Sequence, residues 1–157
     1  MLISTLKQQA KCAELSQEAL YLYARLGPLS CRTTPGVFGV LVMAGLAELQ
    51  GFLHRTEPSP RFIEDAVRVE AAMGELIAAE AVDREERPDG QWVLLLPDLP
   101  LLDGCSPANL LMRPKRLEQL PADSRVAQRA IALIEADNER RRQERPHRFA
   151  RAGGGAP

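Results

Sequence analysis

The strongest constraint on the fold is a helical pattern that runs directly into a pattern of two strands. Between about Arg61 and Glu80, apolar residues recur one helical turn apart, and several alanines raise the helix propensity. Residues 81–86 can then extend as one strand, and residues 91–96 return as an apolar, β-prone run. Between them, Pro88-Asp89-Gly90 supplies a residue able to take positive φ. The sequence therefore predicts a helix followed by a β-hairpin.

The N-terminal third predicts a further helix, a short strand and a short helix. Apolar residues between Leu2 and Leu26 recur at three-to-four spacing, which predicts one helix, either continuous or interrupted near Ser16. Gly27-Pro28 is expected to end it. Residues 37–41 form a short apolar stretch that fits a strand, and residues 43–52 fit a short helix.

The C-terminal third predicts two more helices and a tail. The first would begin near Ser106-Pro107 and break or kink at Pro114, and the second would run from about Asp123 to Glu144. The remaining residues lack apolar periodicity, so disorder is expected there. The organisation predicted from these patterns is an N-terminal helix (1–27), the rest of a core domain (28–104), a helical extension (105–144) and a disordered tail (145–157).

The order of helix, strand, two helices and hairpin is that of a winged helix. The predicted fold class is therefore mainly α with a small β-hairpin, a winged helix-turn-helix with a C-terminal helical extension. A three-helix core would then be closed by Phe38, Leu46, Leu49, Ile63, Val67, Leu76, Ile77 and Val93.

A more specific resemblance covers about Tyr21 to Val126. The segments that carry it are ALYLYARLG, PGVFGVL, LAELQGF, AAMGELIAAEAVDRE, GQWVLLLPDLP and CSPANLLMRPKRLEQLP. In this order they resemble the winged-helix region of replication-initiator-like and related regulatory proteins of phages and other mobile elements. The resemblance implies binding to duplex DNA, with the third helix in the major groove and the wing on the backbone. It places Arg61 and Arg68 on the outer face of that helix, and Arg84 and Arg87 on the wing.

Acidic residues on the same elements oppose this implication. The third helix also carries Glu64, Asp65, Glu70, Glu75 and Glu80, and the wing carries Asp83, Glu85, Glu86 and Asp89. Phosphates are repelled by such a surface, so DNA would depend on a few well-placed arginines. The alternative is a solvated face with ion pairs along the helix, such as Glu64 with Arg68.

A second candidate DNA-binding segment lies near the C-terminus. Residues 139–151 contain six arginines and two glutamates, a balance of +4 in a chain whose net charge is −1. The rest of the chain is therefore acidic. Arg140, Arg141, Arg142 and Arg145 are candidate phosphate contacts, and a solubilising tail is the alternative interpretation.

Other residue types point away from catalysis and metal binding. The chain has two histidines and three cysteines, at spacings that match no zinc site or redox pair, and it has no glycine-rich phosphate loop. We therefore expect no catalytic residue, no metal and no cofactor. Trp92 is expected to cover the edge of the core or, alternatively, to stack on a partner. The methionines are expected to fill the core.

Two classes of function remain open. One is a DNA-binding regulator or replication accessory of a phage or mobile element. The other is a protein-interaction module, either a homodimer or an adaptor to a host or phage protein, that uses the acidic surface. In a variant of the DNA-binding class, the C-terminal tail alone contacts nucleic acid. The sequence shows neither an export signal nor a membrane-spanning run, so a cytoplasmic protein is expected.

Overall fold

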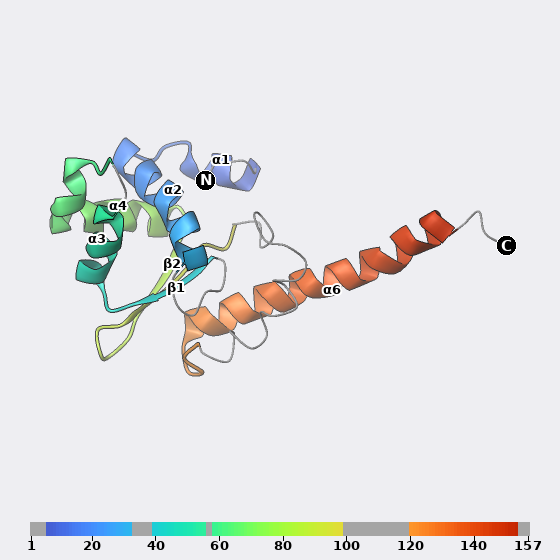
Figure 1. The fold of residues 1–157 in the computed structure, drawn as a ribbon. Coiled ribbons are helices and arrows are strands. Elements are labelled where there is room, and N and C mark those ends of the chain that lie inside the picture. The colour runs from blue at the N-terminus through green and yellow to red at the C-terminus, as the bar shows by residue number, and fades with distance from the viewer. Residues whose placement is uncertain (1–5, 33–38, 56–57, 99–119, 154–157) are drawn as a thin grey trace.

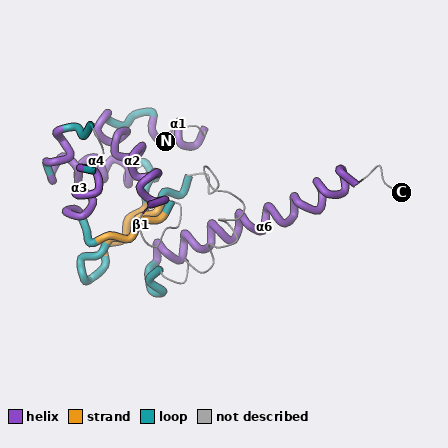
Figure 2. The backbone as a smooth tube through the Cα atoms, in the orientation of Figure 1, coloured by secondary structure: helices purple, strands orange, loops and turns teal. Residues whose placement is uncertain are grey.

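The computed structural model describes residues 6–32, 39–55, 58–98 and 120–153. Over these residues the chain is mostly helical, with one small sheet that lies between a group of helices and a single long helix (Figure 1, Figure 2). The helix predicted from Ser106 lies outside the described residues, as do Phe38, Cys105 and Met112. Within them, no helix combines the length and apolarity needed to cross a membrane.

The sheet has three antiparallel strands, β1 (Val40–Met43), β2 (Asp83–Glu86) and β3 (Trp92–Leu95), in the order β1-β3-β2. β2 and β3 form the predicted hairpin, and Gly90 in its turn has a φ of 84°. β1 was expected slightly earlier in the chain. It pairs with the other edge of β3, which is therefore the central strand.

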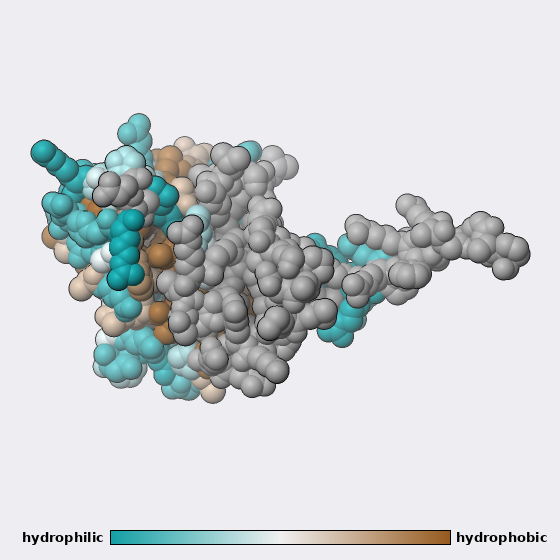
Figure 3. Space-filling model, in the orientation of Figure 1, coloured by the Kyte–Doolittle hydropathy of each residue, from teal (hydrophilic) through white to brown (hydrophobic). Residues whose placement is uncertain are grey.

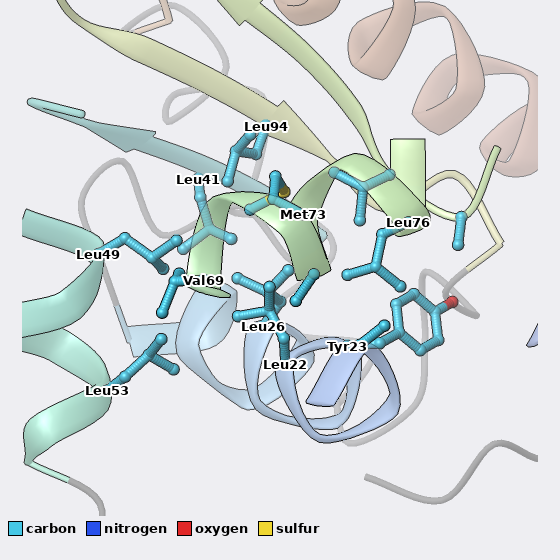
Figure 4. Close-up of a cluster of buried hydrophobic side chains, with 14 of the residues drawn as sticks. Leu22, Tyr23, Leu26, Leu41, Leu49, Leu53, Val69, Met73, Leu76 and Leu94 are labelled. Atoms are coloured by element: carbon cyan, nitrogen blue, oxygen red, sulfur yellow. The ribbon is translucent and has the colours of Figure 1, made fainter. Parts of the chain in front are cut away.

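One face of the sheet packs against three helices, α2 (Gln17–Arg32), α3 (Leu46–His54) and α4 (Ala66–Ala78). Leu41 of β1 and Leu94 of β3 point into this core, where they meet apolar side chains from all three helices (Figure 4). The helical side chains labelled there are Leu22, Tyr23, Leu26, Leu49, Leu53, Val69, Met73 and Leu76. Met43 and Met73 are buried, as predicted, and so is Trp92.

The opposite face of the sheet packs against α6 (Arg125–Gly153). Alternate residues of β1 and β3 form a second core with the first turns of α6, whose members include Val126, Ala130 and Ile134. Val93 belongs to this second core, so its predicted place in the three-helix core is wrong. Because neighbouring residues of a strand point to opposite faces, β3 is buried on both sides.

The N-terminal segment forms two helices, α1 (Leu6–Cys12) and α2, with the interruption at Ser16. The Ser16 hydroxyl accepts a hydrogen bond from the Ala19 amide at 3.2 Å. The predicted end of the second helix at Gly27-Pro28 is wrong, because α2 continues through Pro28 to Arg32. Buried Ser30 fixes this last part of the helix by donating to the Gly27 carbonyl and accepting from the Gly39 amide.

The third predicted helix is divided. A short 3₁₀ turn, η1 (Arg61–Glu64), precedes α4, and the Asp65 carboxylate caps α4 by accepting from the Val67 and Arg68 amides. Val67 lies two residues before buried Val69 and therefore on the opposite side of α4, where 78% of it is exposed, so its predicted place in the core is wrong. Leu49, Ile63 and Leu76 are buried as predicted, and Leu46 and Ile77 pack at the margin of the core.

The end of α4 leads directly into the hairpin. The Ala81 amide donates to the Leu76 carbonyl, and the Glu80 amide donates to the Ile77 carbonyl, which is the Schellman pattern. Glu80 has a φ of 60°, a conformation that favours glycine. The turn of the hairpin lies beside Gly45, the residue before α3. Gly45 has a φ of 102°, and a Cβ added to it would lie 3.3 Å from the Gly90 carbonyl oxygen.

α6 begins against the sheet and then extends away from the rest of the molecule as a rod (Figure 1). Its 29 residues correspond to about 43 Å at the usual helical rise. Residues 145–153, where the sequence predicts a disordered tail, form the last part of this helix in the structure. Beyond the turns that pack on the sheet, the α6 sequence has no apolar face and is rich in arginine, glutamine and alanine, which are good helix formers. We call residues 138–153 of α6 the arm.

We predict that Ile134→Ala lowers the free energy of unfolding by about 2–4 kcal/mol, because it leaves a cavity between α6 and the sheet. Urea unfolding followed by circular dichroism measures the change. Ala132→Ser, at an exposed position of the same helix, is the matched control and should change stability little. An Ile134→Ala variant as stable as the wild type would show that α6 does not pack on the sheet in solution.

Candidate nucleic-acid interface

The outer face of α4 is largely uncharged. Val67, Ala71, Gly74 and Ala78 are all exposed and follow one another along one side of the helix. Arg61 lies just before α4, in η1, and its side chain is also exposed. Among the described residues, no carboxylate pairs with Arg61. Of the four arginines that the sequence places on the third helix and wing, Arg61 is thus the one left with an unneutralised charge.

Arg68 is held by residues of its own chain. Its guanidinium pairs with the Glu18 carboxylate of α2 and lies 5.8 Å from the centre of the Phe62 ring. The sequence suggested an ion pair between Arg68 and Glu64, whereas the structure pairs Arg68 with Glu18. Glu64 lies in η1, before α4 begins. The ion pair ties α4 to α2 and reduces the positive charge that Arg68 can offer a ligand.

Arg84 connects the hairpin to α4. It pairs with Glu70 at 2.6 Å and with Glu86 at 3.2 Å, and its guanidinium lies 4.7 Å from the centre of the Trp92 ring. Only 15% of its side chain is exposed. Trp92 thus covers the edge of the core, as predicted, with Arg84 stacked on it. Neither group is free to stack on a nucleic-acid base.

Arg87, just after β2, is held in the same way. It pairs with Asp123 at 2.7 Å and with Glu85 at 3.2 Å, and 16% of its side chain is exposed. The hydrogen bond from Arg87 lowers the pKa of Asp123. Asp123 precedes α6, so Arg87 joins the hairpin to the start of that helix. The arginines predicted on the wing therefore hold the fold together.

A further cluster, made of ion pairs that were not predicted from the sequence, joins α6 to β2. The Asp83 carboxylate accepts two hydrogen bonds from Arg125, at 2.9 and 3.0 Å, and one from Arg129 at 2.8 Å. Hydrogen bonding from Arg125 lowers the pKa of Asp83 below its ordinary value, although burial opposes the shift. We call Asp83, Arg125 and Arg129 the latch. Arg125 and Arg129 are four residues apart and so share a helix face, which is the one signal that the sequence offers.

The arm carries arginines on the part of α6 that extends beyond the body. From Glu139 onward, every described side chain of the arm is exposed. Arg140 pairs with Asp137, and Arg142 lies 3.6 Å from Glu139, with 66% and 72% of the two arginine side chains exposed. Arg141 and Arg145 belong to the same helix. The Arg142–Glu139 pair, exposed on both sides, is weak and is readily exchanged for a stronger anion, whereas only 14% of the Asp137 side chain is exposed.

Figure 3 shows the hydropathy of the described residues on one face of the molecule. Hydrophilic side chains cover much of the body, with small apolar areas between them, and the described atoms where α6 leaves the body are hydrophilic.

Among the described residues, no group of histidine, cysteine and carboxylate side chains could hold a metal ion. Burial raises the pKa of the Cys12 thiol, and the nearby Asp98 raises it further. Cys12 is therefore a protonated core residue.

No protein-family model, curated protein or solved structure matches this chain. Its own surface chemistry is therefore the basis for a functional proposal. That surface has two kinds of arginine. Those of the hairpin and of the first turns of α6 pair with carboxylates of the hairpin, of α4 and of Asp123, whereas the described arginines of the arm, Arg140 and Arg142, pair only with carboxylates of α6 itself. Arg61 pairs with no carboxylate among the described residues.

We predict that Asp83→Asn lowers the stability of the protein by about 1 kcal/mol near neutral pH, because it weakens the latch. A lowered pKa in the folded state stabilises the protein above the ordinary aspartate pKa of about 3.9, and this contribution is lost as the pH falls through the folded value. The difference between the two proteins should therefore shrink on acidification. Urea unfolding across a pH series measures it.

Asp89→Asn is the matched control for this experiment. Asp89 is exposed in the hairpin turn, where its carboxylate accepts from the Gln91 amide, and an asparagine can keep that bond. The control should follow the wild type at each pH. A constant gap between Asp83→Asn and the wild type down to acidic pH would contradict the assigned role of the Asp83 charge.

Proposed function

We propose that this chain is a non-enzymatic winged-helix protein that binds duplex DNA chiefly through the arm. The observation that carries the proposal is the separation of charge. Body arginines on the hairpin and the first turns of α6 are neutralised by carboxylates, whereas the arm carries its arginines away from the body on an exposed helix. A regulator or replication accessory of a phage or mobile element is the role that the sequence resemblance favours.

The topology supports the winged-helix assignment. Helix α2, strand β1, helices α3 and α4, and the β2–β3 hairpin follow one another in the chain, and the sheet order is β1-β3-β2. In this assignment α4 is the recognition helix and the hairpin is the wing. The outer face of α4 is largely uncharged and the wing carries carboxylates, so neither surface attracts phosphates strongly. The body then orients the arm, and α4 contributes less to affinity than in a typical winged helix.

The chemistry of the arm suits a polyanion. A helix that is polar on all sides gains little from its own chain, so an external partner can stabilise it. Duplex DNA carries one negative charge per about 1.7 Å of its axis, a density that a lone carboxylate does not offer. Arginine also matches phosphate oxygens with two parallel hydrogen bonds. An arm with six arginines within residues 139–151 thus favours phosphates over its own glutamates.

We predict that replacing Arg140, Arg141, Arg142 and Arg145 by glutamine weakens binding to a random-sequence duplex and flattens its salt dependence. The slope of log affinity against log salt should fall by about 3–4, since each phosphate contact contributes about 0.9. Fluorescence anisotropy of the full-length chain measures both. Glutamine keeps the helix propensity while it removes the charge.

Lysine at the same four positions is the matched control, because it keeps the charge, and it should largely preserve the slope. Two outcomes would overturn the proposal. One is the absence of duplex binding by the wild type at low salt. The other is a glutamine variant whose affinity and slope equal those of the wild type.

The outer face of α4 favours a second candidate, a homodimer formed through that helix. Val67 is the large apolar residue most exposed on the described surface, and small uncharged residues continue the face beyond it. If α4 pairs with a second copy, the chain sediments as a dimer at high salt, and Val67→Asp should return it to a monomer. Ala122→Asp, at an exposed position outside α4, is the control. A monomeric wild type would exclude this candidate.

A further inference from the structure

Four side chains form a continuous row across the surface between α2 and α4. The Arg25 guanidinium lies 5.5 Å from the centre of the Tyr21 ring, one turn away on α2. The Tyr21 ring meets the Phe62 ring edge-on, with the ring centres 5.7 Å apart. The Arg68 guanidinium lies over the other aromatic ring, that of Phe62. The row therefore has an arginine at each end and two aromatic rings between them. We call it the stacked row.

The stacked row differs from the other arginine contacts of the body in its ion pairs. Arg68 is neutralised by Glu18, but Arg25 pairs with no carboxylate among the described residues. Arg61 is exposed immediately beside Phe62 and is likewise unpaired within the described part of the chain. Glu64 and Asp65, also exposed, balance the charges of these two arginines but form no ion pair with either of them. Arg25 and Arg61 are therefore guanidinium groups without a carboxylate partner among the described residues.

Stacking prepares Arg25 for a phosphate. A guanidinium that rests on an aromatic ring uses its face for that contact and keeps its N–H edge for acceptors. Because the ring already restrains the side chain, less conformational entropy is lost when a ligand binds. A carboxylate partner would occupy the same edge, as Asp83 does for Arg125. The Tyr21 ring restrains Arg25, and no carboxylate of the described residues occupies the N–H edge of its guanidinium.

We propose that Arg25, restrained by the Tyr21 ring, and Arg61, which precedes Phe62 in the chain, each contact a phosphate of the DNA backbone and together act as a second phosphate-binding site. This inference rests on the proposed function, since it takes duplex DNA as the ligand. η1 and the start of α4 lie at the end of the body opposite to the arm (Figure 1). The chain would then hold DNA phosphates at both of its ends, and one molecule could contact two segments of duplex.

The test measures duplex affinity over a salt series for full-length Arg25→Gln and Arg61→Gln, alone and together, by fluorescence anisotropy. Each substitution should lower the slope by about 0.9, the contribution of one phosphate contact. Arg129→Gln is the matched control, since it removes an arginine whose partner Asp83 is still held by Arg125. It should leave the slope unchanged.

Arg25→Lys separates charge from stacking. Lysine keeps the charge but lacks the planar fork, so the slope should recover to that of the wild type while the affinity recovers only in part. If Arg25→Gln is poorly folded by circular dichroism, Arg25→Lys and Arg61→Gln still decide the question. A slope in Arg61→Gln equal to that of Arg129→Gln, together with full affinity in Arg25→Lys, would overturn the inference.

The outcomes also distinguish this inference from the proposed function. If the wild type does not bind duplex, the proposed function fails. If the wild type binds and the arm variant weakens binding, but the Arg25 and Arg61 variants behave like Arg129→Gln, the second site alone is disproved. Adding Arg25→Gln and Arg61→Gln to the arm variant should remove most of the binding that remains.

Discussion

The two-sided burial of β3 is the constraint on which the rest of the structure depends. Trp92, Leu94 and Leu96 face the three helices, and Val93 and Leu95 face α6. A run of five consecutive apolar residues cannot leave one face to water without a large loss of hydrophobic free energy. The sheet therefore needs a layer on each side, and α6 supplies the second one. The direction in which the arm leaves the body follows from the docking of α6 on this strand.

Charge on the body serves mainly to fasten these layers together. Arg84 joins the hairpin to α4, Arg87 joins it to the segment before α6, and the latch joins β2 to α6 itself. Each pair uses an arginine that would otherwise strengthen a phosphate-binding surface. The acidity of the third helix and wing is thus in part a structural requirement. Arg25 and Arg61 pair with no carboxylate among the described residues, and Arg140 and Arg142 pair only with carboxylates of α6.

Much of the fold could be predicted because local patterns agree with the final packing. The hairpin followed from Pro88-Asp89-Gly90 and the apolar run after it, and the buried side of α4 followed from its periodicity. Val67 was placed in the core for its apolar side chain, although the same periodicity puts it on the face opposite to Val69 and Met73. Pro28 led to the prediction that α2 ends there, but hydrogen bonds through Ser30 keep this helix intact past the proline.

The candidate site was less predictable for a related reason. Arginines and carboxylates were visible in the sequence, but their pairing joins residues that are far apart in the chain, such as Asp83 and Arg125. Arg25 carried no signal of its own, since its role depends on the meeting of Tyr21 with Phe62. The arm was found from its composition. Its helical form was predicted as far as Glu144 but not beyond, because a segment without an apolar face gives no periodic signal.

The close approach of Gly45 to Gly90 has a consequence for which residues position 45 can accept. A Cβ added there would lie 3.3 Å from the Gly90 carbonyl oxygen, closer than an ordinary van der Waals contact. The φ of 102° at Gly45 is also one that side-chain-bearing residues rarely adopt. The join between β1 and α3 therefore depends on glycine beside the hairpin turn, and a larger residue there would have to displace one of the two segments.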